Sequence, residues 1–272
     1  MMGPLETYSF GFIGAGVMGS ALLAAAVKTI PASKITVTDI SHEKYESAAA
    51  QFGCKTGASN REVVQKTDII FLAVKPDQIP STIAHIAPEL SGKILVSIAA
   101  GVSLSALAKY TAGCDVAAII RIMPNLPATI GEGMLALSAL ESSCSRHAAA
   151  LVKEALKAAG VIEEVDERLM DCVTGISGSG PAYACLFIEA LADAAVLLGM
   201  PRQQAYLHAA QTLKGAAALV LESHKHPAAL KDAVCSPAGT TIEAVRVLEA
   251  KGFRSAVIEA AIAAAKKAAQ RG

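Results

Sequence analysis

The chain has 272 residues, with 24 basic and 24 acidic side chains and an aromatic fraction of 4%. The balanced charge and the few aromatic residues argue against a nucleic-acid partner, which needs a basic surface and stacking side chains. The length predicts two domains, and the six cysteines, scattered without a Cys-x-x-Cys pair, argue against a zinc site or disulfide framework and favour a reducing compartment.

The first ten residues, MMGPLETYSF, have neither the basic nor the apolar region of a signal peptide, and they lack the arginine of a transit peptide. We therefore expect a cytoplasmic protein. The longest apolar run, residues 182–200, contains Glu189 and Asp193 four positions apart on one helical face. We expect this run to be a buried helix with one polar stripe, and we predict no membrane partner.

A glycine-rich turn follows the first predicted strand, residues 8–13, and precedes a predicted helix at residues 20–27. In the G-x-G-x-x-G pattern, Gly14 turns the chain, Gly16 lets backbone N–H groups approach a pyrophosphate, and Gly19 lets helix and strand pack closely. The helix N-terminus then offers free N–H groups and its positive dipole end to the phosphates. Glycines also collect in ordinary strand-to-helix turns, so the pattern alone is equally consistent with a dinucleotide site and with a simple turn.

The second predicted strand, residues 34–39, ends at Asp39, twenty residues after Gly19. In the dinucleotide pattern an acid at this position bonds the adenosine ribose hydroxyls, which favours NAD over NADP. The alternative is that Asp39 caps the helix that starts near His42. The sequence leaves both interpretations open.

Three further predicted strands, at residues 68–74, 94–100 and 117–123, end in polar or small residues. Lys75 and Pro76 follow the apolar run at residues 68–74, and Pro124 and Asn125 follow the run that ends at residue 123. Ligands in this fold class lie beyond the carboxyl ends of the strands, where a nicotinamide could rest; alternatively, Lys75 is an ordinary solvated loop lysine. The remaining elements are strands at 54–57, 133–138 and 160–165, and helices at 43–52, from 59–60 onward, and at 146–159.

The alternation of strands and helices predicts an α/β domain over residues 1–166, a Rossmann-type doubly wound sheet. From residue 166 onward the apolar period becomes 3.6, which predicts an all-α domain over residues 167–272. Ser179 and Pro181 are expected to form the cap and first turn of a helix. The helices are predicted at 181–198, 202–223, 228–234, 241–251 and 254–269.

A second glycine-bearing turn, SPAGTT at residues 236–241, comes directly before one of these helices. Hydroxyls and free backbone N–H groups at a helix start can hold a small carboxylate. Spacing alone favours the simpler interpretation that Thr240 or Thr241 caps the helix, which is compatible with a ligand site. The nearby His224 and His226 have no third ligand at a suitable spacing, so we predict no metal site.

These motifs resemble those of the pyrroline-5-carboxylate reductase family over nearly the whole chain. The matching segments are GFIGAGVMG at 11–19, FLAVKP at 71–76, SIAAGV at 97–102, RIMPN at 121–125, TGISGSGPAY at 174–183 and the highly specific HPAALKDAVCSPAGTTIEAVRVLEAKGFR at 226–254. The resemblance implies the reduction of 1-pyrroline-5-carboxylate to L-proline by NAD(P)H, the last step of proline biosynthesis. Two residues depart from the family pattern: Ala238, where most members have glycine, and Asp39, where many have serine or asparagine and use NADPH.

The resemblance also implies site residues, an oligomer and a cofactor. Substrate is expected at Ser236, Gly239, Thr240 and Thr241, with Thr241 as the catalytic residue that hydrogen-bonds the ring nitrogen. The family uses NADP, whereas Asp39 favours NAD. The expected assembly is at least a homodimer through interlocked helical domains, with the decamer as the larger assembly that the family forms, and the active site is completed across the dimer. The cofactor is expected to contact Gly14, Ala15, Gly16, Val17, Met18, Gly19, Asn60, Ala73, Val74, Lys75, Pro76, Met123, Pro124 and Asn125, to which the dinucleotide pattern adds Asp39.

Two other functions are consistent with part of the chain. The β-hydroxyacid dehydrogenases begin with a similar glycine turn, but Ala184 stands where they have a catalytic lysine. A catalytically inactive nucleotide-binding sensor or scaffold would be expected to have lost the carboxylate turn, which this chain retains. The reductase is therefore the favoured prediction.

Overall fold

The computed structural model describes residues 5–270. The chain divides into two compact units, one of residues 1–179 and 263–272 and the other of residues 180–262. The domain boundary that we place at residue 166 rests on the change in sequence period and stays a prediction.

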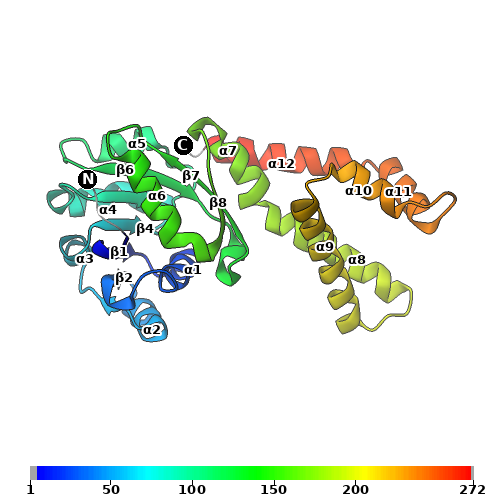
Figure 1. Ribbon diagram of the computed structural model, residues 1–272, viewed down its shortest axis with the longest axis horizontal. Helices are drawn as coiled ribbons and strands as arrows, with labels where there is room; N and C mark the ends of the chain where they lie inside the picture. The colour runs from blue at the N-terminus through cyan, green and yellow to red at the C-terminus, as the bar shows by residue number, and fades with distance from the viewer. Residues whose placement is uncertain (1–4, 271–272) are drawn as a thin grey trace. The chain divides into compact units, whose positions relative to one another are not determined.

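The first unit is built on an eight-stranded sheet of order β3-β2-β1-β4-β5-β6-β7-β8 (Figure 1). All neighbouring strands are parallel except β6 and β7. The strands are β1 Phe10–Ile13, β2 Ile35–Thr38, β3 Lys55–Thr56, β4 Ile69–Leu72, β5 Ile94–Ser97, β6 Ala118–Met123, β7 Gly133–Ala139 and β8 Gly160–Glu164. Each lies within one or two residues of a predicted strand, apart from the longer predicted runs around β4 and β5.

Helices cover both faces of this sheet. In β4, Ile69 and Phe71 belong to one apolar cluster, and Ile70 and Leu72 belong to another. The first cluster includes side chains of α1, α2 and α6, and the second includes side chains of α3, α4 and α5. Since successive side chains of a strand point to opposite faces, a strand with a continuous apolar sequence is buried on both sides. The doubly wound fold expected from the sequence is confirmed.

The antiparallel direction of β7 follows from its connection. Only a short 3-10 helix, Leu126–Ile130, lies between β6 and β7. A parallel pair needs a crossover of a dozen or more residues, so this short link reverses the chain. The next connection contains α6, Ser145–Leu156, and β8 is again parallel to β7.

Four of the seven α-helices in this unit were predicted at least in part, and three were missed. The missed ones are α4, α5 and α7, although Ile79, Ile83 and Ile86 of α4 are spaced along one buried face. The helices are α1 Val17–Ala26, α2 His42–Phe52, α3 Asn60–Lys66, α4 Ile79–Ile86, α5 Leu104–Tyr110, α6 Ser145–Leu156 and α7 Met170–Val173. Shorter 3-10 helices are η1 Leu5–Thr7, η2 Ala32–Lys34, η3 Pro76–Gln78, η4 Ala87–Glu89, η5 Leu126–Ile130, η6 Lys157–Ala159 and η7 Glu167–Leu169.

The second unit is helical, as predicted. Its helices are α8 Gly180–Leu197, α9 Arg202–Ser223, α10 Pro227–Val234, α11 Thr240–Ala250 and the larger part of α12 Phe253–Ala269. Helices α8 and α9 pack closely through Ala192, Ala205 and Ala209, which form a small buried cluster. Alanine side chains allow two helix axes to approach but bury little apolar area.

The prediction that residues 182–200 form a buried helix is wrong for the single chain. Of the α8 side chains only Ala192 is buried, and Leu186 and Leu197 are 67% and 88% exposed. The helical stretch Glu167–Leu197 is long and apolar enough, by length and composition alone, to cross a membrane. Contact with a second copy of the chain accounts for the exposure of these side chains in the single chain.

The prediction that Ser179 caps a helix beginning near residue 181 is also wrong. The chain is already helical before this point, because α7 leads into a π-helical turn, Thr174–Gly178. The Ser179 N–H group donates to the carbonyl oxygen of Thr174, five residues earlier, at 2.9 Å. Ser179 therefore closes a widened turn that leads directly into α8, instead of capping a helix that starts from a loop.

Candidate functional site

The glycine-rich turn is wedged between the carboxyl ends of β2 and β4. The N–H group of Gly14 donates to the carbonyl oxygen of Thr38 at 2.8 Å. Gly14 has a φ of 108°, and a Cβ added to it would lie 2.5 Å from the carbonyl oxygen of Ala73. Gly19, in the first turn of α1, allows a similar approach, because a Cβ there would collide with the carbonyl oxygen of Gly14. Only glycine satisfies both positions.

The N-terminus of α1 fits the pyrophosphate of a dinucleotide. Gly16 is the N-cap, and among residues 5–270 no side chain bonds the first N–H groups of the helix. A Cβ added at Gly16 would meet none of the described atoms within 4 Å, so the N-cap itself borders open space. Val17, the first helical residue, is 68% exposed. This end of the helix can therefore receive an anion without rearrangement.

Asp39 ties the glycine-rich turn to the end of β2. Its Oδ2 atom accepts a hydrogen bond from the Ala15 N–H group at 2.7 Å, and its Oδ1 atom accepts one from Ser41 at 2.9 Å. The N-cap of α2 is Ser41, so the interpretation of Asp39 as the helix cap is wrong. Neither sequence interpretation included the bond to Ala15, which lies 24 residues away in the chain.

The other predicted cofactor segments lie at the same edge of the sheet. Because β1, β2, β3, β4, β5 and β6 are parallel, their carboxyl ends share one edge, where Ala73 donates its N–H group to Ile13 at 2.8 Å. Lys75 is exposed and begins a short 3-10 helix, with its N–H group 3.3 Å from Gln78 Oε1. Asn60 is the first residue of α3, after the N-cap Ser59. The fold thus brings the predicted cofactor residues of the first unit to one edge.

Asn125 differs from the rest because its side chain is used internally. It is 8% exposed. Its Oδ1 atom accepts a hydrogen bond from the Met134 N–H group at 2.9 Å, and its Nδ2 atom donates to the carbonyl oxygen of Ser177 at 3.0 Å. The side chain thus joins the end of β6 to the start of β7 and to the π-helical turn.

The second glycine-bearing turn lies in the second unit and starts α11. The Gly239 N–H group donates to the Ser236 carbonyl oxygen at 3.0 Å, so residues 236–239 form a β-turn. The N-cap of α11 is Gly239, and Thr240 is the first helical residue, so the interpretation of Thr240 or Thr241 as the cap is wrong. Within the described chain, no hydrogen bond of the Ser236, Thr240 or Thr241 hydroxyls is present. The turn therefore offers uncapped N–H groups and unpaired hydroxyls together.

The charged side chains near this turn are paired with one another. The Arg246 guanidinium bonds Glu243 in a bidentate pair, with N–O distances of 2.6 and 3.0 Å, and it holds the pKa of that carboxyl below its ordinary value. On α10, Asp232 raises the pKa of Lys231, whose Nζ atom lies 2.9 Å away. Arg246 therefore balances the charge of Glu243, the acid in the first turn of α11. Because that charge is balanced, it repels an anion at the helix start less strongly.

The two histidines before this turn have structural positions. His224 ends α9 in the left-handed conformation with a φ of 53°, and the Nδ1 atom of His226 accepts the Ala228 N–H group at 3.1 Å, which caps α10. In the part of the chain that the structure describes, no three potential metal ligands gather.

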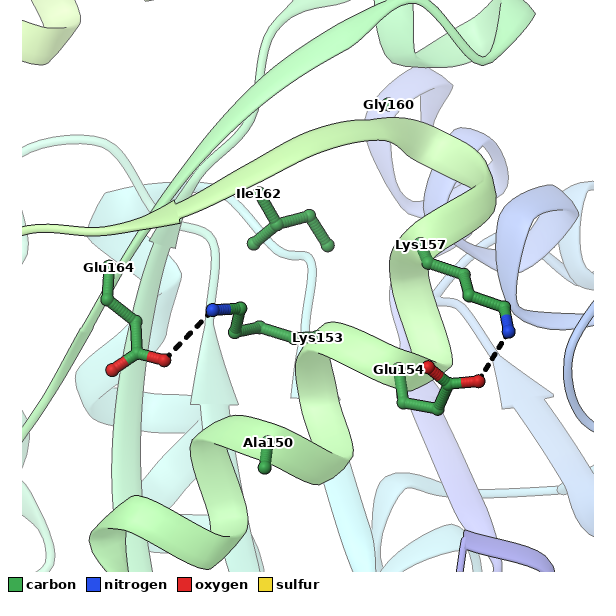
Figure 2. A pocket seen from close by; sticks show the side chains of 7 residues that line it. All are labelled: Ala150, Lys153, Glu154, Lys157, Gly160, Ile162 and Glu164. Carbon is green, nitrogen blue, oxygen red and sulfur yellow. Dashed lines mark hydrogen bonds and ion pairs between the residues drawn. The ribbon is translucent and has the colours of Figure 1, made fainter.

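A separate surface hollow lies between α6 and β8 (Figure 2). Its two lysines are held by ion pairs, Lys153 to Glu164 at 3.1 Å and Lys157 to Glu154 at 2.5 Å. None of the predicted cofactor or substrate residues lines it. Since each lysine already has an acidic partner, the hollow provides no unpaired charge for a ligand.

Comparisons with known proteins decide between the functions considered so far. The family described as pyrroline-5-carboxylate reductase dimerisation matches residues 167–271, and the family described as NADP oxidoreductase coenzyme F420-dependent matches residues 9–101. The chain is 47% identical to the pyrroline-5-carboxylate reductase of Escherichia coli over 92% of this chain and 93% of that one. The chain belongs to the pyrroline-5-carboxylate reductase family.

Solved structures agree with this assignment. A pyrroline carboxylate reductase of Plasmodium falciparum, solved with NADP bound, has a TM-score of 0.88 and 33% identity, covering 99% of this chain and 100% of that one. A pyrroline-5-carboxylate reductase of Coxiella burnetii has a TM-score of 0.90 and 32% identity, covering 98% of this chain and 99% of that one. The similarity to the pyrroline-5-carboxylate reductases therefore includes both the sheet and the helices.

The dimerisation family accounts for the exposed apolar side chains of the helical unit. Its match spans all the residues from α8 to α12 that the structure describes. The large exposed apolar residues there include Leu186, Leu197, Leu207, Leu221 and Ile258. Exposed apolar residues gathered on one domain are a common feature of protein–protein interfaces. The chain forms an oligomer with other copies of itself.

The contacts that hold the predicted residues in place were not predicted from the sequence. Met134 and Ser177 are the partners of Asn125, and Ala15 is the partner of Asp39. In the segment TGISGSG, Gly175, Gly178 and Gly180 lie closer together than a plain helix start requires. The other contacts join residues far apart in the chain and leave no local pattern.

Asp39 provides a test of cofactor choice in this chain. An Asp39→Asn variant loses the negative charge and keeps one oxygen as an acceptor for the Ala15 N–H group. Because a carboxylate beside the adenosine ribose repels a 2′-phosphate, kcat/KM for NADPH is expected to rise relative to NADH by roughly tenfold, or about 1.4 kcal/mol. Steady-state kinetics with both cofactors measures the ratio. An unchanged ratio would show that Asp39 serves only to hold the turn.

Ala238, one of the two departures from the family pattern, has a backbone conformation that is unfavourable for alanine. Its φ is 56°, in the left-handed region, at the third position of the β-turn, where glycine is favoured. An Ala238→Gly variant is expected to be more stable by up to about 1 kcal/mol, with an increase in Tm of a few degrees. Ala244→Gly, the same change inside α11, is the matched control and is expected to lower Tm. A decrease in Tm for both variants would contradict the strain at Ala238.

Proposed function

We propose that this chain reduces 1-pyrroline-5-carboxylate to L-proline with a reduced nicotinamide dinucleotide, the last step of proline biosynthesis. The observation that carries the proposal is the start of α11, where uncapped N–H groups lie beside the unpaired hydroxyls of Ser236, Thr240 and Thr241. A carboxylate is the small group that this combination binds best. The family to which the chain belongs acts on a substrate with such a carboxylate.

The reaction needs little from the protein beyond positioning. When bound, the reduced nicotinamide supplies a hydride from its C4 atom to C5 of the substrate. The C=N bond becomes a C–N single bond, and the nitrogen of the protonated imine retains its proton as the amine of proline. A protonated imine is already electrophilic, so no strong acid is required and correct placement can account for much of the rate.

The residues of the first unit have binding functions in this proposal. The glycine-rich turn holds the pyrophosphate; its residues are Gly14, Ala15, Gly16, Val17, Met18 and Gly19. Asp39 lies toward the adenosine ribose. Asn60 and the segments 73–76 and 123–125 form the remaining cofactor bed. The relative from Plasmodium falciparum is solved with NADP bound. NADP(H) is therefore the cofactor that we assign, with NADH as the second cofactor to compare because of Asp39.

The substrate is held from the second unit. The N–H groups and hydroxyls at Ser236, Gly239 and Thr240 bind its carboxylate. The Thr241 hydroxyl, which is free of internal partners in the described chain, bonds the ring nitrogen. We assign Thr241 as the catalytic residue on this basis, with no metal ion in the reaction.

The proposed assembly rests on the helical domain and on the family resemblance. A homodimer through the helices of residues 167–272 is the minimum assembly, and a decamer is the larger one implied by the family resemblance. Light scattering on the purified protein measures the mass directly. Small molecules are the proposed ligands, without nucleic acid or membrane, and the cytoplasm is the proposed location.

A direct assay tests the function. The protein is mixed with NADPH or NADH and pyrroline-5-carboxylate, and the absorbance of the reduced nicotinamide is followed. A decrease that depends on both the protein and the imine is expected. No decrease with either cofactor would reject the reductase, and cofactor binding without turnover would then favour a sensor. Oxidation of a β-hydroxyacid with NADP would favour the dehydrogenase alternative, which Ala184 argues against.

A further inference from the structure

The helix that begins the family's dimerisation region is interrupted by a π-helical turn. The turn, Thr174–Gly178, follows α7 directly and ends where the Ser179 N–H group bonds the Thr174 carbonyl oxygen. Two of its side chains bond carbonyl groups one turn earlier: Thr174 Oγ1 lies 2.8 Å from the Met170 oxygen, and Ser177 Oγ lies 3.1 Å from the Val173 oxygen. Such turns are rare in proteins, and those that do occur frequently lie at functional sites.

The π-helical turn packs against the end of β6. A Cβ added to Gly178 would lie 2.6 Å from the Cε atom of Met123. Met123 is the last residue of β6 and is followed by the buried Pro124. The absence of a side chain at Gly178 thus gives the Met123 side chain its place. This is the strand end where the cofactor bed is proposed.

Asn125 holds the two segments together. Its amide donates to the Ser177 carbonyl oxygen inside the turn, and its carbonyl oxygen accepts the Met134 N–H group at the start of β7. The Asn125 backbone oxygen also accepts the Ala128 N–H group at 3.1 Å. One nearly buried side chain therefore connects the loop after β6 to two separate elements.

We propose that Asn125 is a positioning residue, which sets the Met123 and Pro124 backbone against the π-helical turn and so sets the floor on which the nicotinamide rests. The proposal rests on the proposed reductase function. The side chain acts through the protein, because both of its polar atoms are already bonded to backbone groups. Hydride transfer is sensitive to placement, and a shift of about 1 Å at the reacting atoms costs on the order of 100-fold in rate.

An Asn125→Ala variant removes both bonds. We expect kcat to decrease by roughly 30- to 100-fold, whereas the Kd for NADP, measured by fluorescence titration, changes less than about threefold, because most of the binding energy comes from the distant pyrophosphate turn. Hydrogen exchange should become faster at the Met134 amide and across residues 174–179, where the bonds are lost. The exchange measurement is independent of activity.

An Asn125→Asp variant separates positioning from general stability. The introduced carboxylate accepts from Met134 but repels the Ser177 carbonyl oxygen, so we expect a loss of kcat near neutral pH. When protonated, the carboxyl can donate to Ser177 and accept from Met134 at once, as the amide does. The ratio of the variant's kcat to that of the wild type should therefore rise as the pH falls. A general loss of folding would give no such rescue.

A matched control lies in the same loop. Thr129 is exposed and bonds only the Leu126 carbonyl oxygen, at 2.8 Å, so Thr129→Ala should leave kcat and hydrogen exchange at residues 174–179 unchanged. Wild-type kcat and exchange in both Asn125 variants would overturn the proposal. Failure of the proposed function would appear differently, as a wild-type protein that does not reduce pyrroline-5-carboxylate while the exchange difference at Asn125→Ala persists.

Discussion

A Gly19→Ala variant is expected to lose most of its affinity for NADP(H). The added Cβ would overlap the carbonyl oxygen of Gly14 and lie 3.1 Å from the Cβ atom of Ala73. The Gly14 oxygen is a backbone atom and cannot move without displacing the turn or α1, and overpacking of this kind costs about 1–3 kcal/mol. The Kd, measured by fluorescence titration, should rise by roughly 100-fold at the upper end of that cost.

The neighbouring glycine separates packing from contact with the cofactor. A Gly16→Ala variant adds a methyl group where no protein atom lies within 4 Å, so its Tm should equal that of the wild type. Its affinity for the cofactor should still fall, because the methyl group occupies the space before the helix N-terminus. Gly19→Ala is expected to lower both Tm and affinity. Wild-type affinity in both variants would rule out this turn as the pyrophosphate site.

A Thr241→Ala variant is expected to lower kcat by roughly 100-fold, the cost of removing one hydrogen bond to a reacting group. The Kd for NADP should remain close to the wild-type value, because Thr241 belongs to the substrate side of the proposed site. Its hydroxyl has no partner in the described chain, so the substitution breaks no internal bond and Tm should not change. Stopped-flow measurement of cofactor oxidation, with a parallel titration of NADP, tests both expectations.

Thr241→Ser is the matched control for this variant. Serine keeps the hydroxyl at the second position of α11 and removes only a methyl group, so turnover within a few-fold of wild type is expected. If Thr241→Ala turned over pyrroline-5-carboxylate at the wild-type rate, the assignment of Thr241 as the catalytic residue would be wrong. If both variants were equally slow, the methyl group would be the important feature and not the hydroxyl.

Local patterns predicted most of the elements because their causes are local. The apolar run around β4 predicted a strand buried on both faces, and its side chains do enter two separate clusters. Helix α4 was missed although Ile79, Ile83 and Ile86 lie on one face, since a short element beginning with Ile79 and Pro80 resembles a loop. The antiparallel β7 follows from the length of its connection, which the sequence also contains.

Contacts between distant residues decided the remaining features. Asp39 binds the Ala15 N–H group and Asn125 binds Met134 and Ser177, pairs that no periodicity or spacing rule connects. The exposure of α8 was also beyond the sequence, because an apolar helix has the same composition whether its own chain or a second copy covers it. The left-handed conformation of Ala238 likewise depends on the turn that encloses it.

The sequence alone determined the alternating sheet, the helical second half, the glycine turn and the SPAGTT turn, because these depend on residues adjacent in the chain. Only the tertiary structure decided how those pieces are held: Gly14 against Ala73, Asp39 on the glycine turn, and Asn125 between β7 and the π-helical turn. The physical reason is that side-chain period and turn chemistry act over a few residues. Hydrogen bonds and close packing join whichever residues the folded sheet brings to one edge.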